Sequence, residues 1–554
     1  MEIRVKIEWR EGNSESVYNG PIKVETIVKE LKGTLPYDIL ICQVNDKICR
    51  LDTELNTDCT VRLFDIRHKT ADLCYQISMV FMYENAVHDV LGSEVIVKAE
   101  NALNQGIYTT LRNTEISDEV VERIAERMRE LVDMDLPLNR WQVSRETLIE
   151  RLSEKTKFRT ALEMMEDVPN LDSINVFSIE KEKKPFYTEL VLSTGYLKTF
   201  ALMRYGEGIL LRFATPAAPS SLNEMRDEPL LYDAFDERRR WNQLLHIEYA
   251  SDLNHHVLNG TVLDTVLMSE ALHEKQIAEI AAQIASKGKR LILIAGPSSS
   301  GKTTFSKRLI LQMRICGLQP LYLGTDDYFV ERNETPLDAE GKMNFEDLEA
   351  LDTDLFGKQM NSLLAGEEVD LPEFDFIKGT KVYGKRITSI EKDQPIVIEG
   401  IHALNPLLTK DIADNEKFRI YISPLTEVNI DLRNRISTTD ARLLRRIVRD
   451  SRTRGKDAEN TILQWPSVRA GEEKNIFPYN VEADVFFNSE CIYELSVLKK
   501  YARPQLEKIK PESKAYADAV RLLQFLRFFV EMEDDSIIPN NSILREFIGG
   551  GVIV

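Results

Sequence analysis

The chain has 554 residues, of which 43% are hydrophobic and 29% charged, a composition typical of globular protein divided into several domains. Its formal net charge of −19 disfavours broad, sequence-independent binding to nucleic acid, which needs a basic surface. No apolar run approaches the ~20 residues of a membrane helix, and the alternating start MEIRVKIEWREG does not resemble a signal peptide. We therefore expect a cytoplasmic protein without a membrane partner.

Residues 1–66 predict a small α+β domain. The stretch IRVKIEW alternates apolar and charged residues, as a half-buried strand does. VETIVKELKG follows as a short helix that we expect to end at Gly33. ILICQVNDKIC and CTVRLFDI read as strands around the turn residues Asn45 and Asp46. The order of strand, helix and strands is typical of a ubiquitin-like fold.

Residues 67–217 are predicted to be mixed, and 218–285 to form a helical connector. ISDEVVERIAERMRELVDMD has apolar residues three to four apart and predicts a helix, and Ser144 is expected to cap another. GILLRFATPAAPSS is a strand that runs into a Pro/Ala/Ser linker. ALHEKQIAEIAAQIASKG predicts a helix that ends at Gly288.

From 286 to 500 apparent strands and helices alternate, which predicts a parallel α/β sheet. Residues 501–554 are predicted to be mainly helical, with AVRLLQFLRFFVEM as an apolar-faced helix. The fold class expected for the whole chain is multidomain α/β.

GPSSSGKTT, residues 296–304, matches the spacing of a phosphate-binding loop. It follows the β-rich run RLILIAG and opens the helix KTTFSKRLILQMRICG, which is the order that phosphate binding requires. Lys302 is expected to reach the β- and γ-phosphates, and the Thr303 hydroxyl to bind Mg²⁺. The alternative is a Gly/Ser turn with a solvated lysine.

Two further apolar strands end in acidic residues. LQPLYLGTDDYF ends in Asp326 and Asp327, where an acid can accept a hydroxyl proton during phosphoryl transfer. QPIVIEGIHAL ends in Glu399, a second candidate ligand for Mg²⁺. The alternative for each of these acids is that it only caps a turn or a helix.

TTDARLLRRIVRDSRTRGKD carries six arginines between Arg442 and Arg454. Arg442, Arg445 and Arg449 fall on one helical face. This pattern favours a lid that clamps triphosphate charge over a nucleic-acid patch. A solvated helix face is the third alternative.

These segments together resemble the uridine kinase–phosphoribulokinase family over about residues 290–490. The motifs that carry the resemblance are GPSSSGKTT, TDDYF, NFEDLEALD, LPEFDF, IVIEGIHAL, TDARLLRRIVRD and ADVFFNS. The resemblance implies a P-loop kinase that uses ATP and Mg²⁺. It would transfer the γ-phosphoryl group to a primary hydroxyl, such as the 5′-OH of uridine or cytidine.

The resemblance also implies roles for individual residues. Asp326 would be the general base, Lys302 a catalytic phosphate ligand, and Thr303 and Glu399 the metal residues. Arg445 and Arg449 would contact ATP from the lid. The loop residues expected to bind ATP are Gly296, Pro297, Ser298, Ser299, Ser300, Gly301, Lys302, Thr303 and Thr304. The residues expected on the substrate side are Asp326, Tyr328, Glu346, Phe374, Phe376 and Arg442.

One segment departs from the family pattern. Pyrimidine kinases of the family read the uracil edge with a tyrosine and a histidine, but here LPEFDFIKGT places Phe374 and Gly379 at or near those positions. Phe374 and Phe376 can stack on a base but offer no hydrogen bonds to its edge. The resemblance therefore supports the kinase reaction more strongly than it supports uridine as the substrate.

The front half has resemblances of its own. Residues 1–66 resemble a TGS domain, and 67–217 resemble the second additional, editing-type domain of threonyl-tRNA synthetase, most clearly in STGYLKTF. That family holds zinc with HxxxH, a Cys and a further His. Here HKTAD keeps His68 but has Asp72, and the other two positions fall on Phe186 and Leu190. We therefore expect this fold to lack zinc and editing activity.

The function expected from the sequence is an ATP- and Mg²⁺-dependent nucleoside kinase, most simply one acting on uridine or cytidine. A first alternative is another small-molecule kinase of the superfamily, acting on a pentose phosphate or a pantothenate-like alcohol. A second is an RNA-responsive regulator that uses the loop as a nucleotide switch, although nucleic acid is an unlikely partner for so acidic a chain. The sequence leaves the oligomeric state open, a homo-oligomer included.

Overall fold

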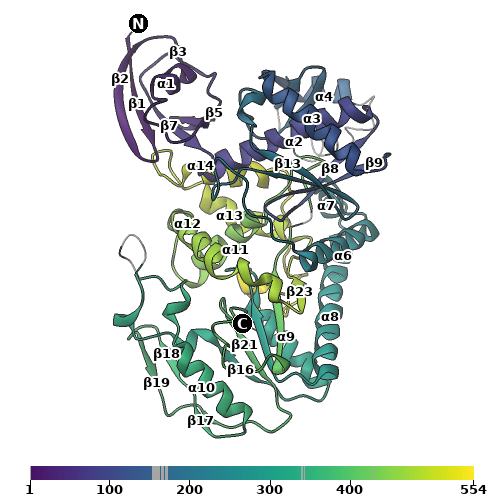
Figure 1. The fold of residues 1–554 in the computed structure, drawn as a ribbon, viewed down its shortest axis with the longest axis vertical. Coiled ribbons are helices and arrows are strands. Elements are labelled where there is room, and N and C mark those ends of the chain that lie inside the picture. Colours follow the sequence, from purple (N-terminus) through teal and green to yellow (C-terminus); the bar gives the residue numbers. More distant parts are fainter. Residues whose placement is uncertain are drawn as a thin grey trace.

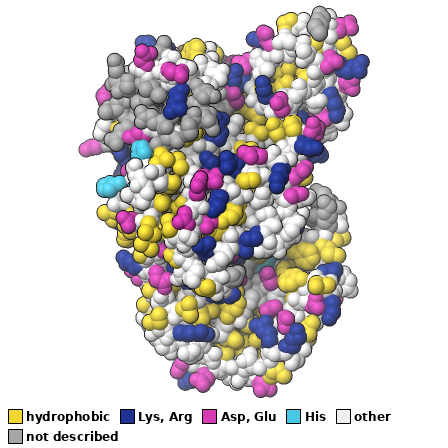
Figure 2. Space-filling view, turned by 180° about the vertical axis from the view of Figure 1, so that it is seen from behind, with side chains coloured by type: hydrophobic (Ala, Val, Ile, Leu, Met, Phe, Trp, Pro, Cys, Tyr) yellow, Lys and Arg dark blue, Asp and Glu magenta, His cyan; other side chains and the backbone are white. Residues whose placement is uncertain are grey.

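The computed structural model describes residues 2–152, 163, 168, 173–337, 341, 343–426 and 428–553. The N-terminal sheet and the kinase-like sheet lie at opposite ends of the molecule, and the long helix α8 (Val262–Lys287) runs along one side (Figure 1). Acidic, basic and hydrophobic side chains are interspersed over the face in Figure 2. Among the described helices, none has the length and apolar character needed to cross a bilayer.

The N-terminal domain is a five-stranded sheet in the order β2-β1-β7-β4-β5, with β1 parallel to β7. The predicted strands and helix are confirmed, and the turn residue Asn45 has a φ of 52°. The helix ends before Gly33: its last residue is Glu30, and Leu31 follows as the C-cap with a ψ of 1°. The elements are β1 (Glu2–Trp9), β2 (Gly12–Asn19), β3 (Ile22–Lys23), α1 (Val24–Glu30), β4 (Ile39–Val44), β5 (Lys47–Cys49), β6 (Glu54–Leu55) and β7 (Cys59–Asp65).

The next region packs helices against two antiparallel sheets, ordered β13-β14-β9-β8 and β10-β11-β12. Its predicted helix is confirmed, and so is the capping role of Ser144, whose Oγ accepts a hydrogen bond from the Thr147 amide at 3.3 Å. The elements are α2 (Lys69–Leu91), β8 (Ile96–Leu103), β9 (Gly106–Arg112), α3 (Asp118–Asp133), β10 (Asn139–Ser144), α4 (Arg145–Leu152), β11 (Ser173–Ile179), β12 (Glu182–Phe186), β13 (Phe200–Tyr205) and β14 (Gly208–Phe213).

The predicted helical connector consists of α6 (Pro229–Leu245), α7 (Ala250–Leu258) and α8. Gly288 ends α8 in the left-handed conformation with a φ of 60°, as the sequence predicted. Helix α8 buries Ile277, Ile280 and Ile284 in a core that it shares with the kinase-like sheet and the C-terminal segment. Helix α8 of the connector is therefore packed against the kinase-like sheet as part of its hydrophobic core.

The predicted parallel sheet is confirmed, in the order β16-β21-β15-β22-β23. The strand that precedes the phosphate loop, β15, lies at its centre. The strands are β15 (Leu291–Ala295), β16 (Leu321–Gly324), β21 (Ile396–Glu399), β22 (Lys417–Ser423) and β23 (Val485–Asn488), and the helices are α9 (Lys302–Ile315), α10 (Thr353–Leu364), α11 (Thr438–Thr453), α12 (Ala458–Asn475) and α13 (Glu494–Leu506). Two short antiparallel strand pairs lie beside them, β17 (Val369–Asp370) with β20 (Ile387–Thr388) and β18 (Glu373–Asp375) with β19 (Thr380–Val382).

The C-terminal segment is less helical than the sequence predicted. It holds α14 (Tyr516–Leu526) and the short α15 (Arg545–Ile548). Phe528, Phe529 and Met532 follow the apolar pattern of α14 and are buried, but they lie outside the helix. The Asn254 side chain bonds to the backbone of this stretch. Its amide donates to the Phe528 carbonyl at 2.8 Å, and its oxygen accepts from the Val530 amide at 2.7 Å. Tertiary hydrogen bonds replace helical ones here.

Candidate active site

The phosphate loop leaves β15 at Ala295 and enters α9 at Lys302, as predicted. The loop turns tightly, with positive φ values of 61° at Ser299 and 84° at Gly301. A Cβ at Gly296 would overlap the backbone oxygen of Ile422 on the neighbouring strand. The glycines therefore allow the chain to pass close to the sheet and then to turn into the N-terminus of the helix.

Replacing Gly296 by alanine should weaken ATP binding on the order of tenfold or more, because relieving the overlap with Ile422 shifts the loop. Calorimetric titration with ATP is the measurement. Gly33→Ala is the matched control, since a Cβ there has no atom within 4 Å and the residue has no positive φ. Equal ATP affinity in the two variants would contradict this account of the loop.

Glu399 joins the loop to the rest of the sheet edge. In the register of the parallel strands it lies opposite both Ile294 and Gly324. Its Oε2 accepts hydrogen bonds from the Thr303 hydroxyl at 3.3 Å and from the Tyr322 hydroxyl at 3.1 Å. Burial raises the pKa of Glu399, and the Lys302 ammonium opposes that shift. A hydroxyl and a carboxylate are hard oxygen ligands, so this pair fits Mg²⁺.

Asp326 and Asp327 face different surroundings. Asp327 is engaged by protein groups, because its carboxylate pairs with Arg386 at 2.6 Å and accepts the Phe374 amide at 3.4 Å. The Asp326 side chain reaches solvent, yet the protein around it desolvates the carboxyl and raises its pKa, an effect that Lys302 opposes. Of the two acids, Asp326 is thus the one left to accept a proton from a ligand.

Lys302 lies between the acids and the loop. Its Nζ donates to the carbonyl oxygens of Gly296 at 3.0 Å and Pro297 at 3.2 Å. Burial lowers its pKa, while the negative charges of Glu399, Glu546 and Asp326 favour the ammonium form. The ammonium can therefore turn from two loop carbonyls to a phosphate without leaving a negatively charged environment.

The residues expected on the substrate side divide into two groups. Glu346 is close enough to Lys302 to feel its charge: burial and Glu472 raise its pKa, whereas Arg446 and Lys302 oppose the rise, and its contact with a substrate stays a prediction. Tyr328 lies behind the site instead, 1% exposed, with its hydroxyl donating to Gln359 at 2.9 Å. A direct contact between Tyr328 and a substrate stays a prediction, and the structure adds a packing role.

The two predicted stacking residues differ in exposure. Phe374 is 6% exposed and Phe376 is 57% exposed, with 5.2 Å between their ring centroids. Both rings also pack edge-on against Phe329. Phe374 therefore supports the aromatic cluster, whereas Phe376 is exposed, and the stacking of either ring on a base stays a prediction.

The arginine helix α11 is buried along most of its length, which excludes a solvated face or an open nucleic-acid patch at Arg442 and Arg445. Arg442, 2% exposed, pairs with Glu472 and donates to the Ser298 carbonyl at 3.0 Å. Arg445, 0% exposed, pairs with Glu494 at 2.5 Å and donates to the Ser489 carbonyl at 2.8 Å. Both guanidinium groups donate to backbone carbonyls of the loop, Arg442 to Ser298 and Arg445 to Ser299.

Arg449 pairs with its neighbour Asp450 at 2.7 Å and is only partly buried. The expected contacts of Arg442, Arg445 and Arg449 with substrate or ATP stay predictions. For the first two, the guanidinium group is already held in a buried ion pair, which is costly to break.

Two acids at the loop were missed by sequence reasoning. Glu472 of α12 accepts the Ser298 amide at 3.0 Å. Glu546 of α15 accepts the Thr304 amide at 3.2 Å and the Thr304 hydroxyl at 2.7 Å. Neither belongs to a motif, and 174 and 242 residues separate the partners, so no local pattern could have revealed these contacts.

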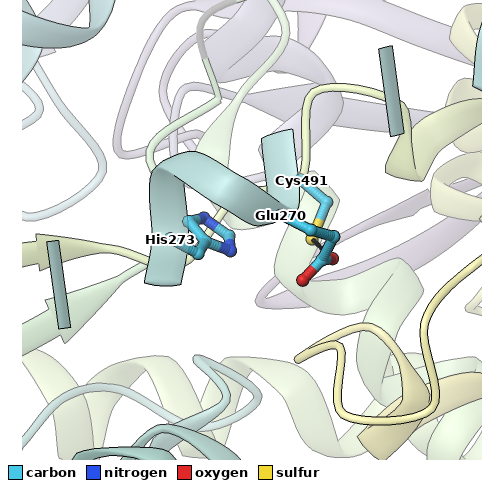
Figure 3. A group of neighbouring side chains, drawn as sticks. All are labelled: Glu270, His273 and Cys491. Atoms are coloured by element: carbon cyan, nitrogen blue, oxygen red, sulfur yellow. Dashed lines mark hydrogen bonds between the residues drawn. The ribbon is translucent and has the colours of Figure 1, made fainter. Parts of the chain in front are cut away.

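A buried cluster of Glu270, His273 and Cys491 has the residue types of a metal site (Figure 3). Its chemistry does not fit one. Glu270 Oε1 already accepts the hydroxyls of Tyr493 at 2.8 Å and Ser542 at 2.6 Å, and the other oxygen faces Arg308 at 3.5 Å. The guanidinium would repel a cation, so the cluster is a polar junction between α8, α9 and the C-terminal segment.

Comparison with known proteins finds relatives of the region that carries this site. The family model described as "Phosphoribulokinase / Uridine kinase family" matches residues 291–494. A uridine kinase of Chloroflexus aggregans is 30% identical over 200 residues, which are 36% of this chain and 85% of that protein. A uridine kinase of Ligilactobacillus salivarius is 29% identical over 177 residues, 32% of this chain and 74% of that protein. A solved structure titled as a possible uridine kinase from Bacillus stearothermophilus is 20% identical, with a TM-score of 0.27, covering 39% of this chain and 98% of that one.

The matched residues begin at β15 and end at the start of α13, so they enclose the phosphate loop, Asp326 and Glu399. Since this stretch covers most of a relative with 30% identity, the chain belongs to the phosphoribulokinase/uridine kinase family and is an ATP-dependent kinase.

Proposed function

We propose that the protein transfers the γ-phosphoryl group of ATP to the 5′-OH of a nucleoside, most simply uridine or cytidine. The observation that carries this is the sheet edge at which Glu399 lies opposite both the loop strand and the Asp326 strand. A metal-side acid, a phosphate loop and a free base within one edge suit transfer to a hydroxyl. A nucleoside is proposed as the acceptor because the relatives are named uridine kinases.

In the proposed mechanism Asp326 accepts the proton of the acceptor hydroxyl, which strengthens the oxygen as a nucleophile. Lys302 turns to the phosphates and neutralises charge that builds up during transfer. Mg²⁺ held by Thr303 and Glu399 would neutralise the β- and γ-phosphate oxygens. Glu346 holds ribose hydroxyls through charge-assisted hydrogen bonds and so orients the 5′-OH towards Asp326.

Another small-molecule kinase of the family is the second candidate. It is favoured by the aromatic cluster of Phe329, Phe374 and Phe376, which offers ring faces and no polar side-chain atom to the edge of a base. Release of ADP, measured with a panel of nucleosides, a pentose phosphate and pantothenate, separates the two candidates. Turnover with pentose phosphate or pantothenate alone would overturn the nucleoside proposal.

For a nucleoside kinase, we expect strict recognition of ribose and loose recognition of the base. Specificity constants for uridine, cytidine and inosine should fall within about tenfold of one another, because stacking tolerates any base. Deoxyuridine should be roughly 30-fold poorer than uridine, the loss expected for one hydrogen bond to the charged Glu346. Strong preference for uridine together with equal use of deoxyuridine would contradict both halves of this expectation.

We also propose that the front half consists of a TGS-like domain, residues 1–66, and a synthetase-like domain, 67–217, without editing chemistry. The proposed units that follow are the connector, 218–285, the kinase domain, 286–500, and the C-terminal segment, 501–554. The absence of editing is supported by His68, whose Nδ1 caps α2 by accepting the Thr70 amide at 3.2 Å, and by Asp72, which pairs with Lys69 at 2.8 Å.

A further inference from the structure

The end of the chain is docked on the phosphate loop. Figure 1 places the C-terminus beside α9, and the side-chain contacts agree. Ile543 covers Gly301 so closely that a Cβ on the glycine would overlap it. Lys307 donates to the Ile553 carbonyl at 2.9 Å. Residues 543–553, which we call the C-terminal clasp, therefore pack against the first two turns of α9.

Glu546 brings a negative charge to the centre of this contact. Its carboxylate accepts both the amide and the hydroxyl of Thr304, in the first turn of α9. Arg452 holds the backbone at Glu546 and the residue after it, donating to the carbonyls of Glu546 and Phe547, each at 3.1 Å. The carboxylate is also close enough to Lys302 to favour its ammonium form.

A phosphate-binding loop uses these same groups for its ligand. The amides at the start of the helix and the positive end of its dipole bind the phosphates of the nucleotide, and the lysine completes the site. A carboxylate that accepts the Thr304 amide is an anion in the place of a phosphate oxygen. Carboxylate and phosphate cannot both occupy it.

We propose that Glu546 is an internal competitor for the phosphates of ATP, and that the clasp leaves Thr304 when the nucleotide binds. The proposal rests on the function proposed for the loop, namely that it binds ATP. In the competing state Glu546 holds the Thr304 amide, and in the nucleotide state that amide passes to ATP. The apparent affinity for ATP is reduced by the fraction of molecules in which the clasp occupies the loop.

The first test is calorimetric titration of ATP with Mg²⁺ into the wild type and into Glu546→Gln. The amide keeps the shape and can still accept from Thr304, but it carries no charge, so ATP affinity should rise on the order of tenfold. Glu533→Gln is the matched control, because it removes the same charge from an exposed position of the C-terminal segment outside the clasp. Glu546→Asp, which keeps the charge but shortens the reach, should also bind ATP more tightly than the wild type.

Unchanged or weaker ATP binding in Glu546→Gln, with the wild type binding ATP, would overturn the proposal and leave the function of the loop intact. Loss of binding in Lys302→Ala confirms that the measured site is the loop. A wild type that binds no ATP would instead remove the proposed function, and the competition with it.

Hydrogen exchange provides a second readout that needs no variant. On addition of ATP, the amides of residues 545–549 should exchange faster, because the turn that carries Glu546 is released from Thr304. Slower exchange in these residues would show that the clasp tightens on the nucleotide, which contradicts displacement.

Discussion

Replacing Asp326 by asparagine should lower turnover by about 10²–10⁴-fold and leave the affinity for ATP nearly unchanged. The amide cannot accept the hydroxyl proton, whereas the loop contacts of Lys302 with Gly296 and Pro297 do not involve Asp326. Steady-state release of ADP gives the first quantity, and calorimetry with ATP gives the second.

Asp327→Asn is the control for this experiment. It weakens the ion pair with Arg386 and is expected to act on the local structure around Phe374, with a smaller effect on turnover than Asp326→Asn. If Asp327→Asn abolished turnover and Asp326→Asn did not, the assignment of the base would be reversed.

The pH dependence of the wild type gives an independent check. Burial raises the pKa of Asp326 above the ordinary value of 3.8. The base works only when it is deprotonated, so kcat/KM should rise as the pH passes this raised pKa. The rise should occur at a higher pH than it would for an exposed aspartate. Asp326→Asn should remove that step from the profile.

Local features of the site were predictable because each depends on a short segment. The strand, the loop of residues 296–301 and helix α9 are contiguous, and their glycine spacing has one physical purpose. The acids Asp326 and Glu399 were predictable because parallel strands end at the same edge of a sheet. The parallel sheet itself followed from the alternation of strands and helices.

Contacts made across the fold were not predictable. The spacing of Arg442 and Arg445 on one helical face was read correctly, but the burial of both depends on Glu472 and Glu494, which lie on other helices. The same limit applies to Glu546, since nothing near it in the sequence indicates that it faces Thr304. The apolar run after α14 was read as helix because a buried irregular segment can have the same composition.

Breaking the buried Arg442–Glu472 pair should destabilise the fold strongly. Arg442→Met is expected to cost about 3 kcal/mol of unfolding free energy, because it leaves a buried carboxylate with less compensation. The value lies at the low end of the range for such pairs, since Arg469 still contacts Glu472 at 3.1 Å. Denaturant unfolding monitored by fluorescence is the measurement.

The double variant Arg442→Met/Glu472→Gln distinguishes the two roles considered for Arg442. If Arg442 serves mainly to neutralise Glu472, the second change removes the uncompensated charge and should recover most of the lost stability, since glutamine can still accept the Ser298 amide. If Arg442 instead binds the substrate, Arg442→Met should raise the KM for the nucleoside with little loss of stability. The double variant would then keep the raised KM, and that result would return Arg442 to the substrate side of the site.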